Sequence, residues 1–315
     1  MFDNITWLVT NKCGLNCKYC NFTNRGIEEL DPLTRGKALE FIKALPGSDE
    51  RFIVLLGGDV LWVPKVVGMV KHLNTLNLPY AFQTSACDAS IMEKVLPHLK
   101  NLSISVDPCP EGDASRWLKS NMGLYWAGRA KQLNPDIDIH ATITIDAKNY
   151  KYVMATVRNL SALGIWSETT LVHWKKGDGY DLVGSQEFTH AFKTEHVSDL
   201  KVLAEKLVAF KVSGGLVHSS DAFLRTIPQY AVEMDWECSG PVSLVLDVDL
   251  SLRLCLHIKG DRVSKWRLWD LTPERWEEFR ADWELDKKEQ CRGCMWDCSM
   301  ECELNAGKSW FDHKE

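Results

Sequence analysis

Three cysteines stand in one short stretch near the N-terminus, with the spacing Cys13-x3-Cys17-x2-Cys20. Thiolates are ligands of iron–sulfur clusters, and three of them on one loop can converge on a single [4Fe–4S] cluster. One iron of that cluster then has no protein ligand, and an open position lets a metal bind a substrate or cofactor. The alternatives are a zinc site, which would need a fourth ligand from elsewhere, and inert reduced thiols. The spacing favours the cluster with an open iron.

A second group of cysteines lies in the last hundred residues. Cys238 and Cys255 bracket two predicted strands, Val242–Val248 and Leu252–Ile258, that form a hairpin around Asp249-Leu250-Ser251. The other four follow as Cys291-x2-Cys294-x3-Cys298-x3-Cys302. A hairpin brings its end cysteines together and a C-x2-C turn offers two more thiolates, so we expect Cys238, Cys255, Cys291 and Cys294 to hold a second [4Fe–4S] cluster. Cys298 and Cys302 are then spare or belong to another cluster. A zinc knuckle is the alternative.

Composition narrows the class of protein that carries these thiols. The 315 residues are 45% hydrophobic and 25% charged, a balance typical of soluble globular proteins. The start of the chain lacks the basic and apolar regions of a secretory signal, and no apolar run approaches the length of a membrane span. Eleven cysteines without such a signal indicate metal or redox chemistry in a reducing compartment, which we expect to be the cytoplasm. A net charge of -6 disfavours nucleic-acid binding.

The elements that must position the cysteines alternate between strand and helix. Six strands are predicted at Ile5–Thr10, Arg51–Leu56, Tyr80–Thr84, Leu102–Asp107, Asp138–Ile145 and Thr169–Trp174. Helices are predicted from Asp31-Pro32 onward, at Pro64–Leu76, Ala89–Leu99, Asp113–Gln132 and Lys151–Leu163, and at Val197–Val212. This alternation predicts a parallel sheet with right-handed crossovers. The character changes near residue 214, which divides the chain into 1–214 and a cysteine-rich 215–315.

The first cysteine octet, with Tyr19 before its third cysteine, resembles the signature of the radical S-adenosylmethionine superfamily. The resemblance implies a partial (β/α)6 barrel of the TIM type. It implies that the methionine group of S-adenosylmethionine chelates the open iron. It also implies that an electron from the cluster cleaves the C–S bond to give a 5′-deoxyadenosyl radical, which abstracts a hydrogen atom from a substrate.

Further matches extend this resemblance over about residues 5 to 172. The turn Gly57-Gly58-Asp59 is similar to the family's Gly-Gly-Glu turn, which holds the methionine amino group, although Asp replaces Glu here. The ends of the third and fourth strands are similar to the family's Thr-Asn-Gly and Ser-x-Asp. The cofactor-binding residues that the resemblance implies are Tyr19, Gly57, Gly58, Asp59, Thr84, Ser85, Ser105 and Asp107.

The C-terminal cysteines resemble the auxiliary-cluster extensions called Twitch and SPASM, in which a hairpin carries a cysteine at each end and a later C-x2-C completes a cluster. The tail departs from SPASM, because three residues rather than five follow its C-x2-C and no seventh cysteine appears. The resemblance therefore implies at least one auxiliary [4Fe–4S] cluster.

The resemblance implies an enzyme of natural-product or peptide modification that acts on a small molecule or a peptide and takes electrons from a flavodoxin or ferredoxin-type reductant. The first strand begins by residue 5, so we expect no separate leader-binding domain, which favours a small molecule or a peptide delivered without one. The loop with Lys175 and Lys176 after the sixth strand is a candidate substrate contact. The net reaction and its catalytic acid or base are not predicted. The rival hypothesis is a non-catalytic iron–sulfur electron carrier or scaffold.

Overall fold

A computed structural model describes residues 4–15, 17, 19–20, 29–46, 52–109, 114–173, 190–238, 243–295 and 297–304. Its centre is one eight-stranded sheet with the order β6-β5-β4-β3-β2-β1-β7-β8. The first six strands in the chain pair in parallel with their neighbours: β1 (Asn4–Thr10), β2 (Phe52–Gly57), β3 (Tyr80–Thr84), β4 (Asn101–Ser105), β5 (Asp138–Ile145) and β6 (Trp166–Leu171). The sheet continues with β7 (Ser243–Leu246), parallel to β1, and β8 (Leu252–Arg253), antiparallel to β7.

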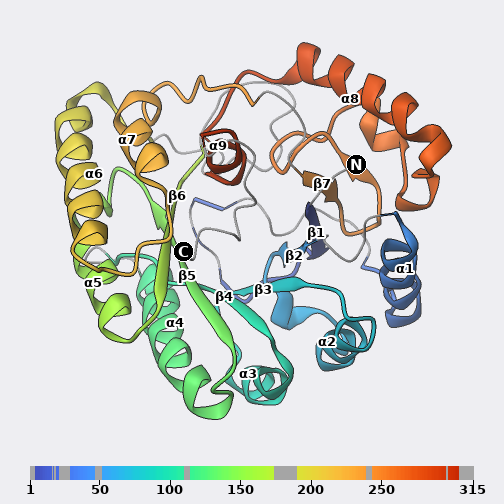
Figure 1. Cartoon of the computed structure of the whole chain (residues 1–315), viewed down its shortest axis with the longest axis horizontal. Coiled ribbons are helices and arrows are strands. Elements are labelled where there is room, and N and C mark those ends of the chain that lie inside the picture. The colour runs from blue at the N-terminus through green and yellow to red at the C-terminus, as the bar shows by residue number, and fades with distance from the viewer. Residues whose placement is uncertain are drawn as a thin grey trace.

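Helices connect these strands and cover one face of the sheet. The α-helices are α1 (Pro32–Ala44), α2 (Val66–Thr75), α3 (Ala89–Val95), α4 (Ala114–Leu133), α5 (Val153–Ala162), α6 (Val197–Val212), α7 (Asp221–Tyr230), α8 (Trp276–Gln290) and α9 (Asp297–Leu304). Figure 1 shows the strands curving in an arc, with α1 to α5 on the outer side and α9 on the inner side. The predicted α/β fold, a partial TIM-like barrel built from six βα units, is confirmed.

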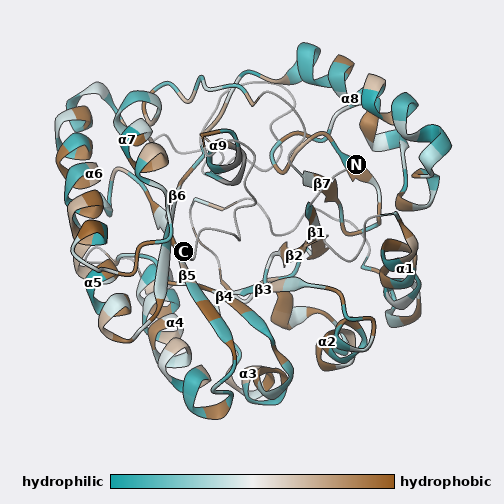
Figure 2. Ribbon diagram, in the orientation of Figure 1, coloured by the Kyte–Doolittle hydropathy of each residue, from teal (hydrophilic) through white to brown (hydrophobic). Residues whose placement is uncertain are grey.

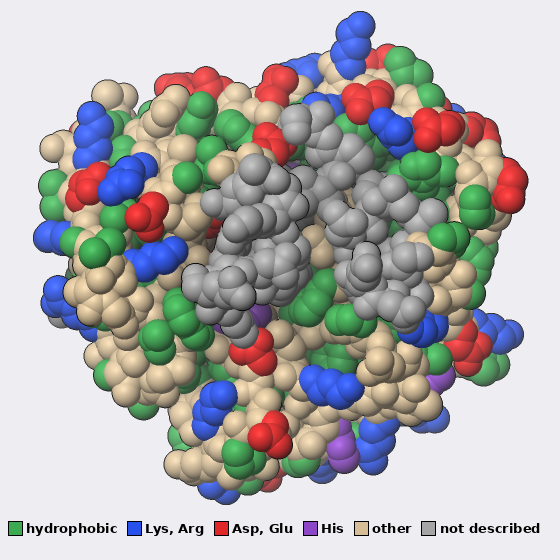
Figure 3. Space-filling model, in the orientation of Figure 1, with side chains coloured by type: hydrophobic (Ala, Val, Ile, Leu, Met, Phe, Trp, Pro, Cys, Tyr) green, Lys and Arg blue, Asp and Glu red, His purple; other side chains and the backbone are tan. Residues whose placement is uncertain are grey.

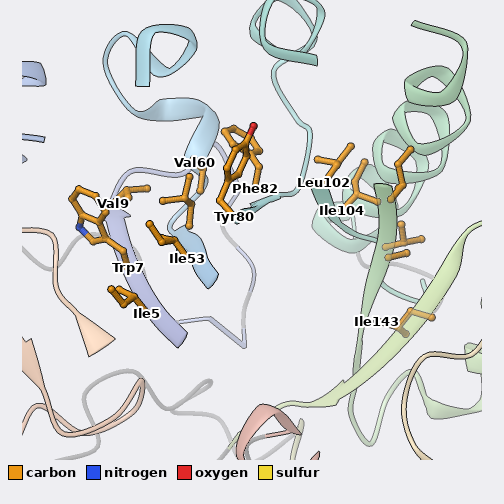
Figure 4. Packing of buried hydrophobic residues seen from close by; sticks show 14 of the residues in the cluster. Ile5, Trp7, Val9, Ile53, Val60, Tyr80, Phe82, Leu102, Ile104 and Ile143 are labelled. Carbon is orange, nitrogen blue, oxygen red and sulfur yellow. The ribbon is translucent and has the colours of Figure 1, made fainter. Parts of the chain in front are cut away.

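Alternation along the strands places one set of apolar residues on the outer face, whereas the inner face carries many polar residues together with a small apolar cluster around Leu8 of β1. On β1, Ile5, Trp7 and Val9 belong to the main core cluster between sheet and helices, and Figure 4 shows them beside Ile53 of β2. Thr6, on the other face of β1, exchanges a 2.8 Å hydrogen bond with Ser243 of β7. Figure 2 shows the matching division on the helices, whose apolar residues turn toward the strands. The inner face is therefore the one free to carry polar chemistry.

Two predicted boundaries need correction. The sixth strand begins at Trp166 and ends at Leu171, because it pairs with β5 from His140 onward, whereas the sequence predicted a start at Thr169. The hairpin is confirmed by the pairing of Val245 with Arg253, but its strands are much shorter than predicted. The second strand of the hairpin, β8, ends at Arg253, because the chain turns back on itself at Cys255–Ile258, where the Cys255 amide donates to the Ile258 carbonyl oxygen.

Within the described ranges no helix is long and apolar enough to cross a bilayer. Figure 3 shows Lys and Arg side chains interspersed with Asp and Glu on the visible face, among the described residues, rather than gathered by sign.

Candidate functional site

The cysteine loop leaves the carboxyl end of β1, where catalytic groups gather in this class of barrel. The Leu15 amide donates to the Cys13 sulfur over 3.3 Å, and the Cys20 amide donates to the Cys17 carbonyl oxygen over 3.0 Å. Burial first, and then the nearby Asp59, Cys20 and Cys17, raise the pKa of Cys13 to about 12. Burial also raises the pKa of Cys17. The three thiols therefore share one poorly solvated space.

Gly57 and Gly58 pack against the backbone of Thr10 and Lys12, which leads into this loop. A Cβ atom at Gly57 would lie 2.2 Å from the Thr10 carbonyl oxygen, and one at Gly58 would lie 2.2 Å from the Lys12 carbonyl oxygen. Gly57 also has a φ of 147°, which disfavours any residue with a side chain. The Gly58 amide donates to the Thr10 carbonyl oxygen and the Asp59 amide to that of Lys12, each over 2.8 Å. The glycines let the end of β2 fix the segment that leads directly into Cys13.

Asp59, almost fully buried, joins the ends of β2 and β3. One carboxylate oxygen accepts hydrogen bonds from the Thr84 hydroxyl at 2.6 Å and the Leu61 amide at 3.1 Å. The other accepts from the Ser85 hydroxyl and from the Ser85 amide at 3.1 Å. Burial raises the pKa of Asp59, and these hydrogen bonds oppose that shift. The sequence predicted Asp59, Thr84 and Ser85 near one cofactor; the structure brings them together, with both carboxylate oxygens already accepting from the chain itself.

Tyr19 points into the protein at the ends of β4 and α4. Its hydroxyl donates to an oxygen of Asp107 and accepts a 2.9 Å hydrogen bond from the Lys119 amine. Lys119 also lies 2.9 Å from the same Asp107 oxygen, and the second Asp107 oxygen accepts from the Thr144 amide at 3.2 Å. The Tyr19 hydroxyl thus anchors the cysteine loop to the barrel at Asp107, which lies two residues beyond Ser105, the last residue of β4.

A second buried ion pair lies beside the Tyr19 ring. The Arg116 guanidinium stands 4.5 Å from the centre of that ring and binds both oxygens of Asp146, at 3.1 and 2.5 Å. The Nδ1 atom of His190 donates a hydrogen bond to the same Asp146 carboxylate. These hydrogen bonds, chiefly those from His190 and Arg116, lower the pKa of Asp146 against the effect of its burial. The pair stiffens the support under the loop.

Sequence reasoning missed Arg116, Lys119, Asp146 and His190. The spacing of Arg116 and Lys119, one helical turn apart near the start of α4, places both on one helix face and is the signal that was present. His190 follows residues 174–189, which include the predicted contact residues Lys175 and Lys176 and lie outside the described residues.

The C-terminal cysteines also converge. Cys291 and Cys238 act electrostatically on Cys255, and burial raises the pKa of Cys255 to about 12 and that of Cys238 to about 11. The Cys255 sulfur accepts from the backbone amides of His257 at 3.3 Å and Ile258 at 3.2 Å.

Cys294 reaches the same region through its backbone. Its amide donates to the Trp236 carbonyl oxygen over 2.9 Å, two residues before Cys238. Gly293 makes this approach possible: its φ is 82°, and a Cβ there would lie 2.7 Å from the Asp235 backbone. Cys298 and Cys302 lie one turn apart on α9, and their side chains fall outside the described residues.

The arrangement of the two groups of thiols can be compared with what a zinc ion and an iron–sulfur cluster each require. Among the described residues no three His, Cys, Asp or Glu side chains come close enough together to hold a single metal ion. Zinc binds thiolate sulfurs at about 2.3 Å, so its ligands crowd around one point, whereas a cubane cluster takes its thiolates at separate corners. Half-buried thiols gathered in these two regions are a donor set that a cubane cluster can use.

The inner face near α9 gathers acids. Glu168 of β6 is buried, and its Oε2 atom lies 3.9 Å from the Nε2 atom of His140. The pKa of Glu168 is raised well above its ordinary value, first by burial and then by Asp297 of α9. Asp297 accepts a 3.0 Å hydrogen bond from Thr170, and Glu301 accepts one from the Ser220 amide over 2.8 Å. α9 is thus docked on the inner face through its carboxyl groups.

The chain has the fold of the radical S-adenosylmethionine enzymes. SuiB of Streptococcus suis bound to S-adenosylmethionine superposes with a TM-score of 0.66 and 13% identity, over 98% of this chain and 75% of that chain. The enzyme anSMEcpe with bound AdoMet superposes with a TM-score of 0.63 and 14% identity, over 98% and 96%. In sequence, the chain is similar to the uncharacterized protein MJ0907 of Methanocaldococcus jannaschii, with 26% identity over 221 residues, 65% of this chain and 71% of that protein. No family model matches the chain.

Proposed function

We propose that this chain is a radical S-adenosylmethionine enzyme that modifies a peptide. The observation that carries the proposal is the convergence of three half-buried thiols beside a Gly-Gly-Asp turn, at the carboxyl edge of a partial barrel. A bound [4Fe–4S] cluster would supply the electron that cleaves S-adenosylmethionine and yields the hydrogen-abstracting radical. Two proteins of the same fold are seen with peptides, SuiB with its precursor peptide SuiA and anSMEcpe with the Cp18Cys peptide, which supports a peptide over a small molecule.

In this proposal Cys13, Cys17 and Cys20 hold the cluster, and the turn of Gly57, Gly58 and Asp59 faces the cofactor. A cofactor ammonium group would replace a hydroxyl donor at Asp59, and the rotatable hydroxyls of Thr84 and Ser85 permit this exchange. Ser105 and Asp107 border the same edge at the end of β4. Tyr19 acts through the loop that it anchors.

Cys238, Cys255, Cys291 and Cys294 hold an auxiliary [4Fe–4S] cluster in a Twitch-like or SPASM-like region of 215–315. Such a cluster would supply an electron acceptor for the substrate when the product is a two-electron oxidation. Two clusters held by cysteine thiolates, as proposed here, favour a reducing compartment, the cytoplasm, and a flavodoxin or ferredoxin-type reductant.

Cofactor cleavage tests the N-terminal assignment. Reconstituted anaerobically and reduced with dithionite, the protein should convert S-adenosylmethionine to 5′-deoxyadenosine. Cys17→Ala should abolish the reaction, while Cys109→Ala serves as the matched control with the thiol lost elsewhere. Retention of wild-type cleavage in Cys17→Ala would refute the assignment of the N-terminal cysteines to the catalytic cluster. No cleavage by the wild type would leave the rival hypothesis of a non-catalytic electron carrier.

Asp59 is tested by binding. Asp59→Ala should weaken S-adenosylmethionine binding about tenfold or more, because it removes a charge-assisted hydrogen bond of roughly 1.5 to 3 kcal/mol. Asp59→Glu should restore part of the affinity. An unchanged affinity in Asp59→Ala would show that this carboxylate only joins β2 to β3.

The auxiliary assignment is tested by metal content. A Cys13/Cys17/Cys20 triple alanine variant should retain iron and sulfide and give the Mössbauer spectrum of one [4Fe–4S] cluster. Zinc, or no cluster, in that variant would refute the assignment.

A further inference from the structure

One buried cation beside the cysteine loop has no role in the function proposed above. Lys119 is only 8% exposed, and its amine lies 2.9 Å from the Tyr19 hydroxyl and 2.9 Å from an oxygen of Asp107. Tyr19 stands between Cys17 and Cys20 in the sequence, so this ion pair is bound to the stretch of chain that joins two of the three cysteines.

The two charges of this pair act in opposite senses on a charge added at the loop. The Lys119 amine favours added negative charge there and the Asp107 carboxylate opposes it, and both bind the hydroxyl of Tyr19, which lies between Cys17 and Cys20 in the sequence. The Asp107 side chain is fully buried and that of Lys119 is 10% exposed, so water screens neither charge effectively.

The remaining charged groups of the network bind one another. Arg116 binds Asp146 through two hydrogen bonds, and His190 binds the same carboxylate. Arg116 contacts the loop only over the Tyr19 ring, whereas Lys119 and Asp107 are the two charges of the network that hydrogen-bond to the loop itself.

We propose that Lys119 raises, and Asp107 lowers, the reduction potential of the [4Fe–4S] cluster held by Cys13, Cys17 and Cys20. The inference rests on the proposed function, since it requires that cluster. Reduction adds one electron and one unit of negative charge to the cluster, while the reductant, of the flavodoxin or ferredoxin type, loses that electron and no bond changes. A nearby cation stabilises the added charge and a nearby carboxylate opposes it. Lys119 thus makes the electron transfer easier.

A purely structural role of the pair predicts a different result. If Lys119 and Asp107 only anchored Tyr19, loss of either would loosen the same loop and move the potential in the same direction. The electrostatic role predicts shifts of opposite sign from two residues that touch each other.

The experiment is a redox titration of the holoenzyme followed by electron paramagnetic resonance, without S-adenosylmethionine. The N-terminal cluster is identified as the paramagnetic signal that the wild type shows and Cys17→Ala lacks. We expect a more negative midpoint in Lys119→Met, a more positive one in Asp107→Asn, and a midpoint near wild type in Lys119→Arg.

Lys131→Met is the matched control, because it removes the same side chain near the far end of α4, where the amine binds the Ile137 carbonyl oxygen at 2.6 Å. It should leave the midpoint unchanged. If Lys119→Met failed to hold iron, an upward shift in Asp107→Asn together with a wild-type midpoint in Lys119→Arg would still support the inference.

Shifts of the same sign, or unchanged midpoints, would overturn the inference. The proposed function would stand in that case if the wild type still cleaves S-adenosylmethionine. A wild-type protein without an N-terminal cluster would overturn the proposed function, and this inference with it.

Discussion

Gly58→Ala probes the contact between the end of β2 and the base of the cysteine loop. The new Cβ would lie 2.2 Å from the Lys12 carbonyl oxygen and 2.6 Å from its carbon, whereas ordinary contacts begin at 3.4 Å. The backbone of Lys12 would have to retreat by about 1 Å, and a backbone cannot rotate away as a long side chain can. The base of the loop must therefore move.

That movement breaks the two 2.8 Å hydrogen bonds that join Gly58 to Thr10 and Asp59 to Lys12. Each is worth about 1 kcal/mol, and overpacking strain adds at least about 1 kcal/mol. We expect Gly58→Ala to lower the free energy of unfolding by about 3 kcal/mol and to reduce the iron bound at Cys13, Cys17 and Cys20.

The assay is urea unfolding with iron analysis, and Gly68→Ala is the matched control. Gly68 lies in α2 with nothing within 4 Å of its Cβ position, so alanine there should stabilise the protein by about 0.5–1 kcal/mol. Equal unfolding midpoints and iron contents for Gly58→Ala and the wild type would refute the close contact described here.

Three further predictions concern other buried groups. Because the pKa of Glu168 is raised in the folded state, its favourable contribution to the free energy of unfolding is full below about pH 4.5 and is lost as the pH rises through the folded-state pKa. In urea unfolding, Glu168→Gln should therefore raise the stability at pH 8 relative to that at pH 5, by about 1.4 kcal/mol for each pH unit that separates the two pKa values. Arg253→Met should cost about 3–5 kcal/mol, because it removes the 2.7 Å partner of the buried Asp247 carboxylate, and adding Asp247→Leu should recover most of that loss in a double-mutant cycle. Ser220→Ala should cost about 1 kcal/mol in thermal unfolding, because the Ser220 hydroxyl accepts from the Phe223 amide and caps α7.

Local sequence signals located most of the barrel. The Asp31-Pro32 start of α1 is confirmed by hydrogen bonds from the Leu33 and Thr34 amides to the Asp31 carboxylate, and α6 has the predicted bounds Val197–Val212. These features depend on residues a few positions apart, which is the range over which capping and periodicity act.

Other elements depended on partners far away in the chain. The helix Asp221–Tyr230 was missed; it contains Pro228, which weakens the local signal, and it is held by packing and by the Ser220 cap. The type and spacing of the thiols could be read from the sequence. The ion pairs of Lys119 with Asp107 and Arg116 with Asp146 could not, because each joins a helix to the end of a strand. Such contacts exist only once the barrel has formed.

The parallel pairing of β1 with β7 has a consequence for biosynthesis. Asn4 finds its neighbour Ser243 only after most of the chain has left the ribosome. At about 5–20 residues per second, one edge of β1 waits on the order of 10 to 50 s for its partner. During that interval a strand that is buried throughout in the finished protein offers unpaired amides and carbonyls to any other nascent chain. The cell must therefore protect the beginning of this protein until its last third has been made.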